Sequence, residues 1–417
     1  MKRRNSQKIL SLPELKSVDN KILQNRVLGR AWAKQHPISV KTYNQVGELN
    51  YNNILLHLKD QTKNSQPELT TNGTFNASRY IEKKVLIDLA KFLKLDFDSL
   101  SGYITAGGTE ANIYAMWVAR NWTEKNSPKQ VNWLIPKTSH YSFNKAVNLL
   151  GLENNPKHQL YYLDKNSEKI TDFTTIKQIL AKFKKDDFIV IALTAMTTEF
   201  GLIDPISETI NYLRKNKLKN IFLHIDACFS GFVLPLLKKY QNIFSYPEIS
   251  SIAVDFHKTF GGPIGSGAIW LNHGLYQYSE VFSSYIQGHA DYTLLGSRNG
   301  ISAVQIYQLW QYKKKSLKKE IKLASEKTTY LYKKLSKLKQ INVLYQPFAN
   351  YLIFSTTIEK EANYQSFVAC CNNFSVSSTR DNNQDYYKVI IDHSINKKTI
   401  DLFIKEIKKC LKKNTTK

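Results

Sequence analysis

The chain lacks the features of membrane and secreted proteins. No stretch of 18 apolar residues occurs in its 417 residues, so we expect no membrane-spanning helix. The basic segment MKRRNSQKIL is not followed by an apolar run of seven or more residues, so we also expect no secretory signal. Cysteine is scarce, and the four thiols show neither metal-ligand spacing nor a disulfide framework. These absences favour a protein of the reducing cytoplasm.

Acidic residues are also in short supply, with 34 against 59 basic ones and a formal net charge of +25. Clustered Lys and Arg attract phosphate, so a nucleic-acid partner is one interpretation of this charge. The basic residues are, however, spread along the whole chain, are almost all lysines and accompany no DNA- or RNA-reading motif. In the densest run, 312–339, apolar residues recur every three or four positions, which is typical of an amphipathic helix with a solvated lysine face. We therefore expect neither a nucleic-acid nor a membrane partner.

What the chain does contain is an alternation of short apolar runs with amphipathic segments. Runs such as DFIVIALTAM (187–196) and NIFLHIDAC (220–228) are typical of buried strands. The alternation predicts an α/β fold with a large, mainly parallel sheet covered by helices. A long helical pattern near 300–339, three further strand patterns and a last helix predict a smaller α/β unit. The expected division is an N-terminal arm over 1–75, a large domain over 76–310 and a small C-terminal α/β domain over 311–417.

Small residues follow the first predicted strand of the large domain, in TAGGTEAN (105–112). Gly107, Gly108 and Thr109 stand between a strand and a helix, where backbone N–H groups and the positive end of the helix suit an oxyanion. The same residues suit a tight turn in which Thr109 caps the helix. The glycine spacing fits neither the nucleotide P-loop nor the dinucleotide fingerprint. An anion cradle and a capped turn both stay open.

Further polar residues follow predicted strands at the carboxyl ends, where open α/β sheets bind ligands. Asp226 ends the run HIDAC, and a carboxylate there is costly unless it meets donors or a cation such as a protonated pyridine nitrogen. His140 offers a ring that stacks or moves protons, or else an ordinary histidine at the start of a helix. Thr197 and Thr198 are either ligand hydroxyls or turn residues.

The segment AVDFHKTFGGPIGSGAIW (253–270) places Lys258, a strongly hydrophilic residue, at the end of a predicted buried strand. This is either a surface lysine at a strand end or an amine that holds a carbonyl compound as a Schiff base inside a pocket. The other clusters favour the second interpretation. A phosphate cradle, a strand-end carboxylate, a ring able to stack and a lysine preceded by His257 are the parts needed to hold pyridoxal 5′-phosphate.

These motifs occur in the order and spacing of a known family. Over roughly residues 70–410 the chain resembles the group II pyridoxal-phosphate-dependent amino-acid decarboxylases, in GYITAGGTEANIYAMWVAR, SHYSFNKA, HIDACFSGFVLP, DFHK and GSRNG (296–300). The resemblance implies the type I, aspartate-aminotransferase-like fold and a homodimer with shared active sites. SHYSFNKA and GSRNG are most similar to the histidine and plant-type serine decarboxylases. DFHK, with an Asp two positions before the His, is instead similar to the archaeal tyrosine/aspartate decarboxylases, and Met196 stands where a glycine is common.

The resemblance implies a role for each cluster. Lys258 would carry the cofactor as a Schiff base, Asp226 would keep the pyridine nitrogen protonated, and His140 would stack on the ring. A threonine of the 197–198 pair would bond the ring hydroxyl. The phosphate would be held by the cradle and two further residues: Gly107, Gly108, Thr109, His257 and, from the neighbouring subunit, Ser297.

A proton donor is expected in SSYIQGHADYTLLGSRNG (283–300). In the resembled family a tyrosine on a mobile loop of this region delivers a proton to the α-carbon after carbon dioxide leaves. Tyr285 is the first candidate, and His289 and Tyr292 are lesser ones. The alternative is a plain surface loop.

The predicted function is decarboxylation of an L-amino acid to its amine, with histidine as the first choice of substrate and tyrosine, aspartate or serine next. An aminotransferase or a carbon–carbon lyase of the same fold is the alternative, because Arg380 is of the kind that fixes a substrate carboxylate. The alternative from another class is an inactive fold that serves as a nucleic-acid-binding or scaffold protein. The intact set of Lys258, Asp226 and His140 argues against it, because an abandoned site is free to lose any of them.

Overall fold

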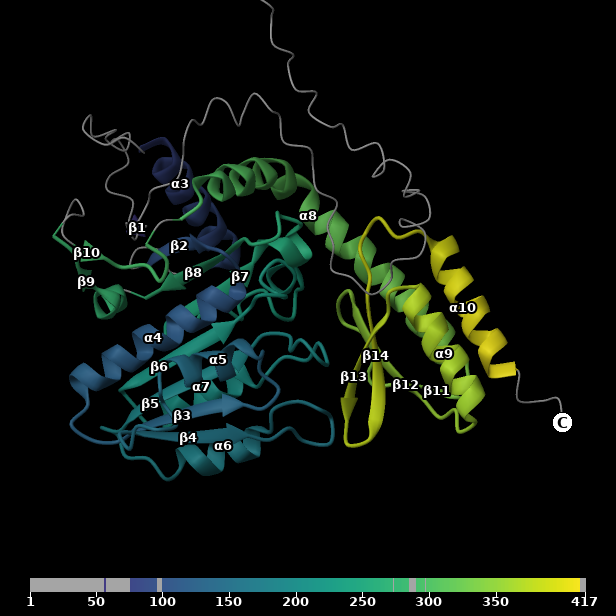
Figure 1. Cartoon of the computed structure of the whole chain (residues 1–417), viewed down its shortest axis with the longest axis horizontal. Coiled ribbons are helices and arrows are strands. Elements are labelled where there is room, and N and C mark those ends of the chain that lie inside the picture. The colour runs from purple at the N-terminus through teal and green to yellow at the C-terminus, as the bar shows by residue number, and fades with distance from the viewer. Residues whose placement is uncertain are drawn as a thin grey trace, which may run out of the picture. The chain divides into compact units, whose positions relative to one another are not determined.

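The computed structural model describes residues 56–57, 76–95, 100–272, 274–284, 290–296 and 298–412. The described residues divide into two compact units, one ending at Lys319 and one beginning at Glu320. The division falls inside the long helix α8 (Gly300–Leu335), drawn in green in Figure 1. Of the expected N-terminal arm, strand β1 (Leu56–His57) is the part that the structure describes.

The first unit is built on an eight-stranded sheet in the order β1-β2-β8-β7-β6-β5-β3-β4. From β7 to β4 neighbouring strands are parallel, whereas β8 runs antiparallel to both β7 and β2, and β1 antiparallel to β2. The mainly parallel α/β sheet expected from the sequence is confirmed. Its further strands are β2 (Ser101–Thr105), β3 (Val131–Pro136), β4 (His158–Leu163), β5 (Phe188–Thr194), β6 (Ile221–Asp226), β7 (Ile249–Asp255) and β8 (Gly267–Leu271).

Nearly every residue of the central strands β5, β6 and β7 is buried, and β5 reads as a continuous apolar run, whereas β6 and β7 also bury polar side chains such as His224. Helix α4 packs across β2, β6, β7 and β8 (Figure 1), and its fully buried Ala111, Ala115 and Val118 let it approach the sheet closely. The helices of this unit are α3 (Asn76–Leu93), α4 (Gly108–Asn126), α5 (Ser142–Leu149), α6 (Phe173–Leu180), α7 (Ile206–Lys215) and the first part of α8.

The second unit holds a four-stranded antiparallel sheet in the order β11-β12-β14-β13. Asn382 and Asn383, both at positive φ, join β13 to β14, as a tight hairpin requires. A core that includes Phe354, Phe367 and Tyr387 packs the sheet against its helices. The elements are β11 (Ile341–Val343), β12 (Tyr351–Thr356), β13 (Ser377–Asp381), β14 (Gln384–Ile390), α9 (Glu361–Asn373), α10 (Lys397–Lys412) and the end of α8.

Three sequence expectations concern absent features. Among the described residues no helix is both long and apolar enough to cross a membrane. The same part of the chain holds no cluster of three or more His, Cys, Asp or Glu able to bind a metal ion. All four cysteines lie within the described residues, and none of them forms a disulfide.

Candidate active site

The predicted site residues lie at the carboxyl ends of five strands of the first sheet that run in one direction. Strands β2, β3, β5, β6 and β7 lead, in that order, to Gly107, His140, Thr197, Asp226 and Lys258. Because such strands end at the same edge of the sheet, their loops gather there.

Lys258 lies in the single wide turn η4 (Phe256–Phe260) that follows β7. Phe256 and Phe260 on either side of it are fully buried, and both rings pack against Phe232, with centroids 5.8 Å and 4.4 Å away. Lys258 itself has non-helical backbone angles, and its side chain keeps 26% of its surface exposed. Two aromatic anchors therefore hold the turn while the lysine points into accessible space.

Asp255, the last residue of β7, holds the lysine turn against the start of α4. Its Oδ2 lies 2.9 Å from the Nζ of Lys258 and 3.7 Å from the Nε2 of His257, and its Oδ1 accepts a hydrogen bond from the N–H of Gly108. Only 4% of the Asp255 side chain is exposed. The sequence analysis did not name it as a site residue, although a carboxylate at a buried strand end is the signal that singled out Asp226.

The charges of the site keep Lys258 protonated and Asp226 ionised. Burial lowers the pKa of Lys258, but the carboxylates of Asp255 and Asp226 more than offset it, so the pKa lies above its usual value. Burial raises the pKa of Asp226, but the Lys258 ammonium group and the N–H of Cys228 outweigh burial and lower it. Lys258 is therefore an ammonium ion that pairs with Asp255 and is further stabilised by the charge of Asp226.

His140 lies between β3 and α5 and shares the site with these charges. Burial lowers the pKa of its imidazole, and Asp226, Lys258 and Asp255 all act on it electrostatically. Its Nδ1 lies 2.9 Å from the Oγ of Ser142, and the N–H of Ser142 points at the same nitrogen from 3.3 Å. The structure thus places an oriented ring near Asp226 and Lys258, and its stacking on a cofactor stays a prediction.

The glycine segment before α4 is tightly packed. Gly107 has φ of 137°, which side chains rarely adopt, and a Cβ there would lie 3.7 Å from the Cε1 of His257. A Cβ on Gly108 would lie 2.2 Å from the Sγ of Cys228. Thr109 follows as a half-buried residue in the first turn of the helix. Gly107, Gly108 and His257 are therefore neighbours at the positive end of a 19-residue helix.

Thr197, the first residue of the hydroxyl pair after β5, has a turn role in the structure. The N–H of Thr197 donates to the carbonyl of Leu202 at 2.7 Å, and its Oγ1 accepts from the N–H of Leu202 at 3.3 Å. Met196, at the position where the resembled family commonly has glycine, has φ of 80°. Thr197 is buried and Thr198 is exposed. The structure therefore shows Thr197 closing a turn, and a bond from either threonine to a ring hydroxyl stays a prediction.

Three of the predicted site residues, Tyr285, His289 and Ser297, lie outside the described residues. Tyr292, the third candidate proton donor, packs its ring against Tyr276 with centroids 5.3 Å apart, and its carbonyl accepts a hydrogen bond from Tyr114.

An amide that the sequence analysis did not single out joins several of these groups. Asn112, on the buried face of α4, donates through Nδ2 to Asp226 Oδ2 and to Ser142 Oγ, both at 2.9 Å. Its Oδ1 lies 3.0 Å from the Nε2 of His224, whose Nδ1 lies 2.8 Å from the Oγ of Ser251. Burial lowers the pKa of His224 to about 4, so this imidazole is neutral. Asp226 also accepts from the N–H of Cys228 at 3.0 Å.

Asp204 is a further buried carboxyl group at this edge of the sheet. It accepts hydrogen bonds from the hydroxyl of Thr171 and from the N–H of Thr194. Burial raises its pKa to about 6, and the negative charge of Asp226 contributes in the same direction. Asp204 therefore titrates well above an ordinary aspartate.

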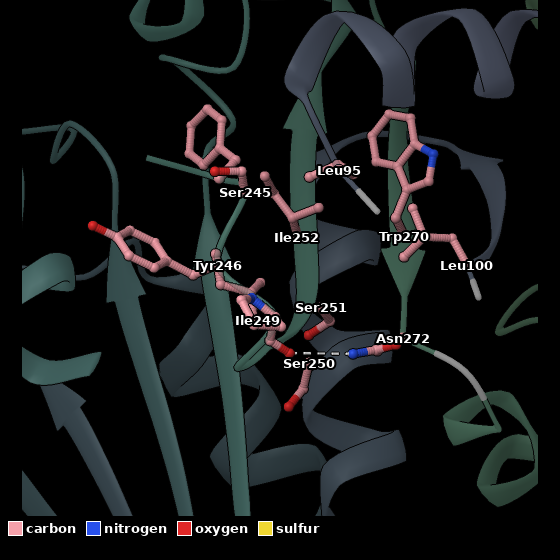
Figure 2. Close-up of a pocket in the computed structure, with 12 residues that line it drawn as sticks. Leu95, Leu100, Ser245, Tyr246, Ile249, Ser250, Ser251, Ile252, Trp270 and Asn272 are labelled. Carbon is pink, nitrogen blue, oxygen red and sulfur yellow. Dashed lines mark hydrogen bonds between the residues drawn. The ribbon is translucent and has the colours of Figure 1, made fainter. Parts of the chain in front are cut away.

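A small cavity of about 90 Å³ lies near the start of β7, at the edge of the sheet opposite to Lys258 (Figure 2). It is lined by residues that include Tyr246, Ile249 and Trp270. The dashed line in Figure 2 is the bond from the amide of Asn272 to the carbonyl of Pro247, at 3.4 Å. Ligand pockets are usually several times larger, so this cavity is not a candidate for the amino-acid site.

A family comparison agrees with this geometry. Residues 74–356 match the pyridoxal-dependent decarboxylase conserved domain. The chain belongs to this family. It is a pyridoxal-phosphate-dependent amino-acid decarboxylase, and the expectation of that activity and cofactor is confirmed.

Individual relatives cover most of this decarboxylase. It is 26% identical to a probable L-tyrosine/L-aspartate decarboxylase of Methanosphaera stadtmanae over 411 residues, which is 95% of each chain. A protein of the same description from Methanosarcina barkeri is 31% identical over 283 residues, 64% of this chain and 68% of its own. Among solved structures, L-methionine decarboxylase from Streptomyces sp. 590 has a TM-score of 0.72 at 18% identity, covering 95% of this chain and 94% of that one. The type I fold is confirmed.

The residues of the site fit pyridoxal 5′-phosphate. The side chain of Lys258 is partly exposed, as a lysine that reacts with an aldehyde requires. Asp226 is ionised, as a protonated pyridine nitrogen requires. Gly107 and Gly108 leave no room for a Cβ without crowding or strain, and they lie at the positive end of α4, which suits a phosphate group.

Proposed function

We propose that this decarboxylase acts on L-tyrosine or L-aspartate and releases carbon dioxide and the corresponding amine. The observation that carries the proposal is the match over 95% of the chain to a relative named for these two substrates. The motif DFHK supports it, since its Asp255 is the feature that resembles the archaeal tyrosine/aspartate decarboxylases. Histidine, the first choice from the sequence, has no support from the relatives.

The substrate is tested by measuring carbon dioxide release from each of the twenty amino acids with purified enzyme and added cofactor. We expect the highest kcat/KM with tyrosine or aspartate, and amine formed in equal amount to carbon dioxide. Faster turnover of histidine or serine would contradict the proposal.

In this proposal the chain's own residues bind and orient the reacting groups. Lys258 would hold the cofactor through its Nζ, and Asp226 would hold a proton on the ring nitrogen. His140 would stack on the ring, and a hydroxyl of Thr197 or Thr198 would bond its phenolic oxygen. When bound, the cofactor supplies the electron sink for the pair of electrons left as carbon dioxide departs.

The phosphate group belongs at the start of α4. Gly107, Gly108 and Thr109 would line its site at the positive end of α4, with the Thr109 hydroxyl as a donor, and His257 would close its other side. The N–H of Gly108 donates to Asp255. His257 is supported by its Nδ1, which donates to the carbonyl of Ser266 at 3.1 Å and so fixes the ring. Ser297 of the neighbouring subunit would complete the cradle in a homodimer, which light scattering on the purified protein tests.

The role of Lys258 has a direct test. Borohydride reduction of the holoenzyme should fix the cofactor on Lys258, as read by peptide mass mapping. Lys258→Ala should show no reduced adduct. A label on any other lysine in the wild-type protein would overturn the assignment.

The aminotransferase alternative rested on Arg380. In the second unit this residue lies on β13, where its side chain is 68% exposed and its Nε lies 3.8 Å from the Oδ1 of Asp385. The family match to decarboxylases does not support this alternative. We also propose the division of the chain into an N-terminal arm over 1–75, a large domain over 76–310 and a small C-terminal α/β domain over 311–417. We further propose a cytoplasmic location and no nucleic-acid partner. A gel-shift assay with DNA and RNA tests the absence of a nucleic-acid partner.

Tyr285 is proposed as the residue that protonates the α-carbon. Tyr285→Phe should still release carbon dioxide, but the amine yield per carbon dioxide should fall, because the proton then goes to the wrong carbon. The products are measured by mass spectrometry. An unchanged ratio would assign the role to another residue, such as His289.

A further inference from the structure

A line of hydrogen bonds behind Asp226 has its donors and acceptors fixed by one charge. Asp226 is ionised and only accepts, so the atom of Asn112 that faces it must be the amide nitrogen. The Oδ1 of Asn112 then faces the Nε2 of His224, which must donate. The neutral His224 has its proton on Nε2, and its Nδ1 accepts from the hydroxyl of Ser251.

The same amide fixes the direction of the bonds toward His140. The second hydrogen on Asn112 Nδ2 points at the Oγ of Ser142. Having accepted it, Ser142 donates its own hydroxyl hydrogen to the Nδ1 of His140. The backbone N–H of Ser142 also points at this nitrogen and can only donate. Two independent donors therefore identify Nδ1 as an acceptor, which leaves the proton of the neutral ring on Nε2.

We propose that Asn112 is a positioning residue that fixes the tautomer of His140 by way of Ser142. Almost no surface is exposed on Asn112, Ser142 and His224. A misplaced donor or acceptor among them therefore could not form a hydrogen bond with water instead. A flipped amide would place its oxygen against the carboxylate of Asp226. The carboxylate of Asp226 therefore fixes the position of the amide nitrogen of Asn112, and the imidazole of His224 fixes the position of its oxygen.

The consequence for the site is chemical. His140 presents an N–H donor, not an acceptor, on the side of the ring away from Ser142. This consequence, unlike the tautomer itself, rests on the proposed decarboxylation. In that reaction the Nε2–H of His140 can donate to an anionic oxygen but cannot remove a proton. The same amide also orients Asp226. Asn112 therefore positions both His140, which is expected to stack on the cofactor ring, and Asp226, which is expected to pair with the ring nitrogen.

The tautomer is directly measurable in the full-length protein without added substrate. Protein labelled with 15N in histidine gives multiple-bond 1H–15N spectra in which the two neutral tautomers have different cross-peak patterns, and the His140 signals are those lost in His140→Gln. We expect the Nε2-protonated form in the wild type. In Ser142→Ala the hydroxyl donor is gone, and the population ratio of the Nδ1-protonated form should rise about fivefold, the change expected for one ordinary hydrogen bond.

Matched variants separate positioning from general damage. Asn112→Leu should shift the His140 tautomer as Ser142→Ala does, and should it fail to fold, Ser142→Ala still decides. Ser142→Thr keeps the hydroxyl and should restore the wild-type pattern, and Ser139→Ala, next to His140 on its other side, should leave it unchanged. An Nδ1-protonated His140 in the wild type, or an unchanged tautomer in Ser142→Ala, overturns the proposal. Absence of carbon dioxide release from every amino acid would reject the proposed function and leave this result untouched.

Discussion

The Nζ of Lys258 lies 2.9 Å from the Oδ2 of Asp255, three residues earlier in the same strand-end turn. This ion pair has little contact with solvent on the carboxylate side, so it is stronger than a surface pair of the same length. It sets the protonation of the amine that must react with the cofactor.

The first prediction follows from this pair. Asp255→Asn removes the charge that raises the pKa of Lys258, so more of the amine is neutral near pH 7 and reacts with an aldehyde. Cofactor uptake by cofactor-free protein, followed by absorbance in a stopped-flow instrument, should become roughly tenfold faster or more. The control is Asp164→Asn, which breaks the exposed pair with Lys137 at 2.7 Å and should leave the rate unchanged. Equal rates in Asp255→Asn and wild type would contradict the argument.

A second prediction concerns Asp226. In Asp226→Asn the group facing the ring nitrogen is neutral, so that nitrogen loses its proton and the electron sink weakens. Turnover should fall by about 10²–10³, the usual cost of lost electrostatic stabilisation. Bound cofactor, measured by release in alkali, should be partly retained. Turnover within a factor of a few of the wild type would reject this role.

The raised pKa of Asp204, about 6, predicts a pH dependence of stability. An unfolded aspartate ionises near pH 4, so between about pH 4 and 6 the unfolded chain loses this proton before the native protein does. The free energy of unfolding falls over this window by about 3 kcal/mol and is not recovered above it. Asp204→Asn cannot ionise, so the variant should gain stability relative to the wild type as pH rises from 4 to 6. The difference in stability is followed by calorimetric Tm values of both proteins over this pH range. Parallel curves of Tm against pH for the variant and the wild type would refute the prediction.

Gly108→Ala tests the packing of the cradle. The new Cβ would lie 2.2 Å from the Sγ of Cys228, so α4 or the segment after β6 must move. We expect a loss of about 1–3 kcal/mol of stability together with weaker cofactor binding, measured by equilibrium dialysis. Gly274→Ala, at φ of 76° but with its nearest neighbour 3.7 Å away, should cost about 1 kcal/mol through backbone strain and leave cofactor binding intact. Equal cofactor binding in Gly108→Ala and wild type would contradict the cradle.

The sequence predicted the features that depend on local pattern. The strands β5, β6 and β7 are mainly apolar, and each ends at a polar residue that the structure places at one edge. Strand β13 was missed because its residues, SSTRD, are half-exposed and polar. Strand β8 was missed because GAIWL follows a run of small residues that reads as a loop.

Asn112 was missed for a different reason. It is one amide on a helix, and its hydrogen-bond partners Ser142 and Asp226 are 30 and 114 residues away in the chain. No periodicity or spacing connects residues that meet only when α4, α5 and β6 pack together. Asp255 is the opposite case, since its position at the end of an apolar run carries the same signal as Asp226.

Because β8 runs antiparallel to its neighbour β7, the loop that carries Lys258 connects two adjacent strands of the sheet. Residues 256–266 leave β7 and return into β8, and the loop is closed at its base by the pairing of Asp255 with Gly267. Both strands are interior to the sheet, so the two ends of this loop stay together until central strands separate. The amide hydrogens of such strands exchange only through large openings. The base of the turn that carries Lys258 should therefore stay closed until the first unit as a whole unfolds.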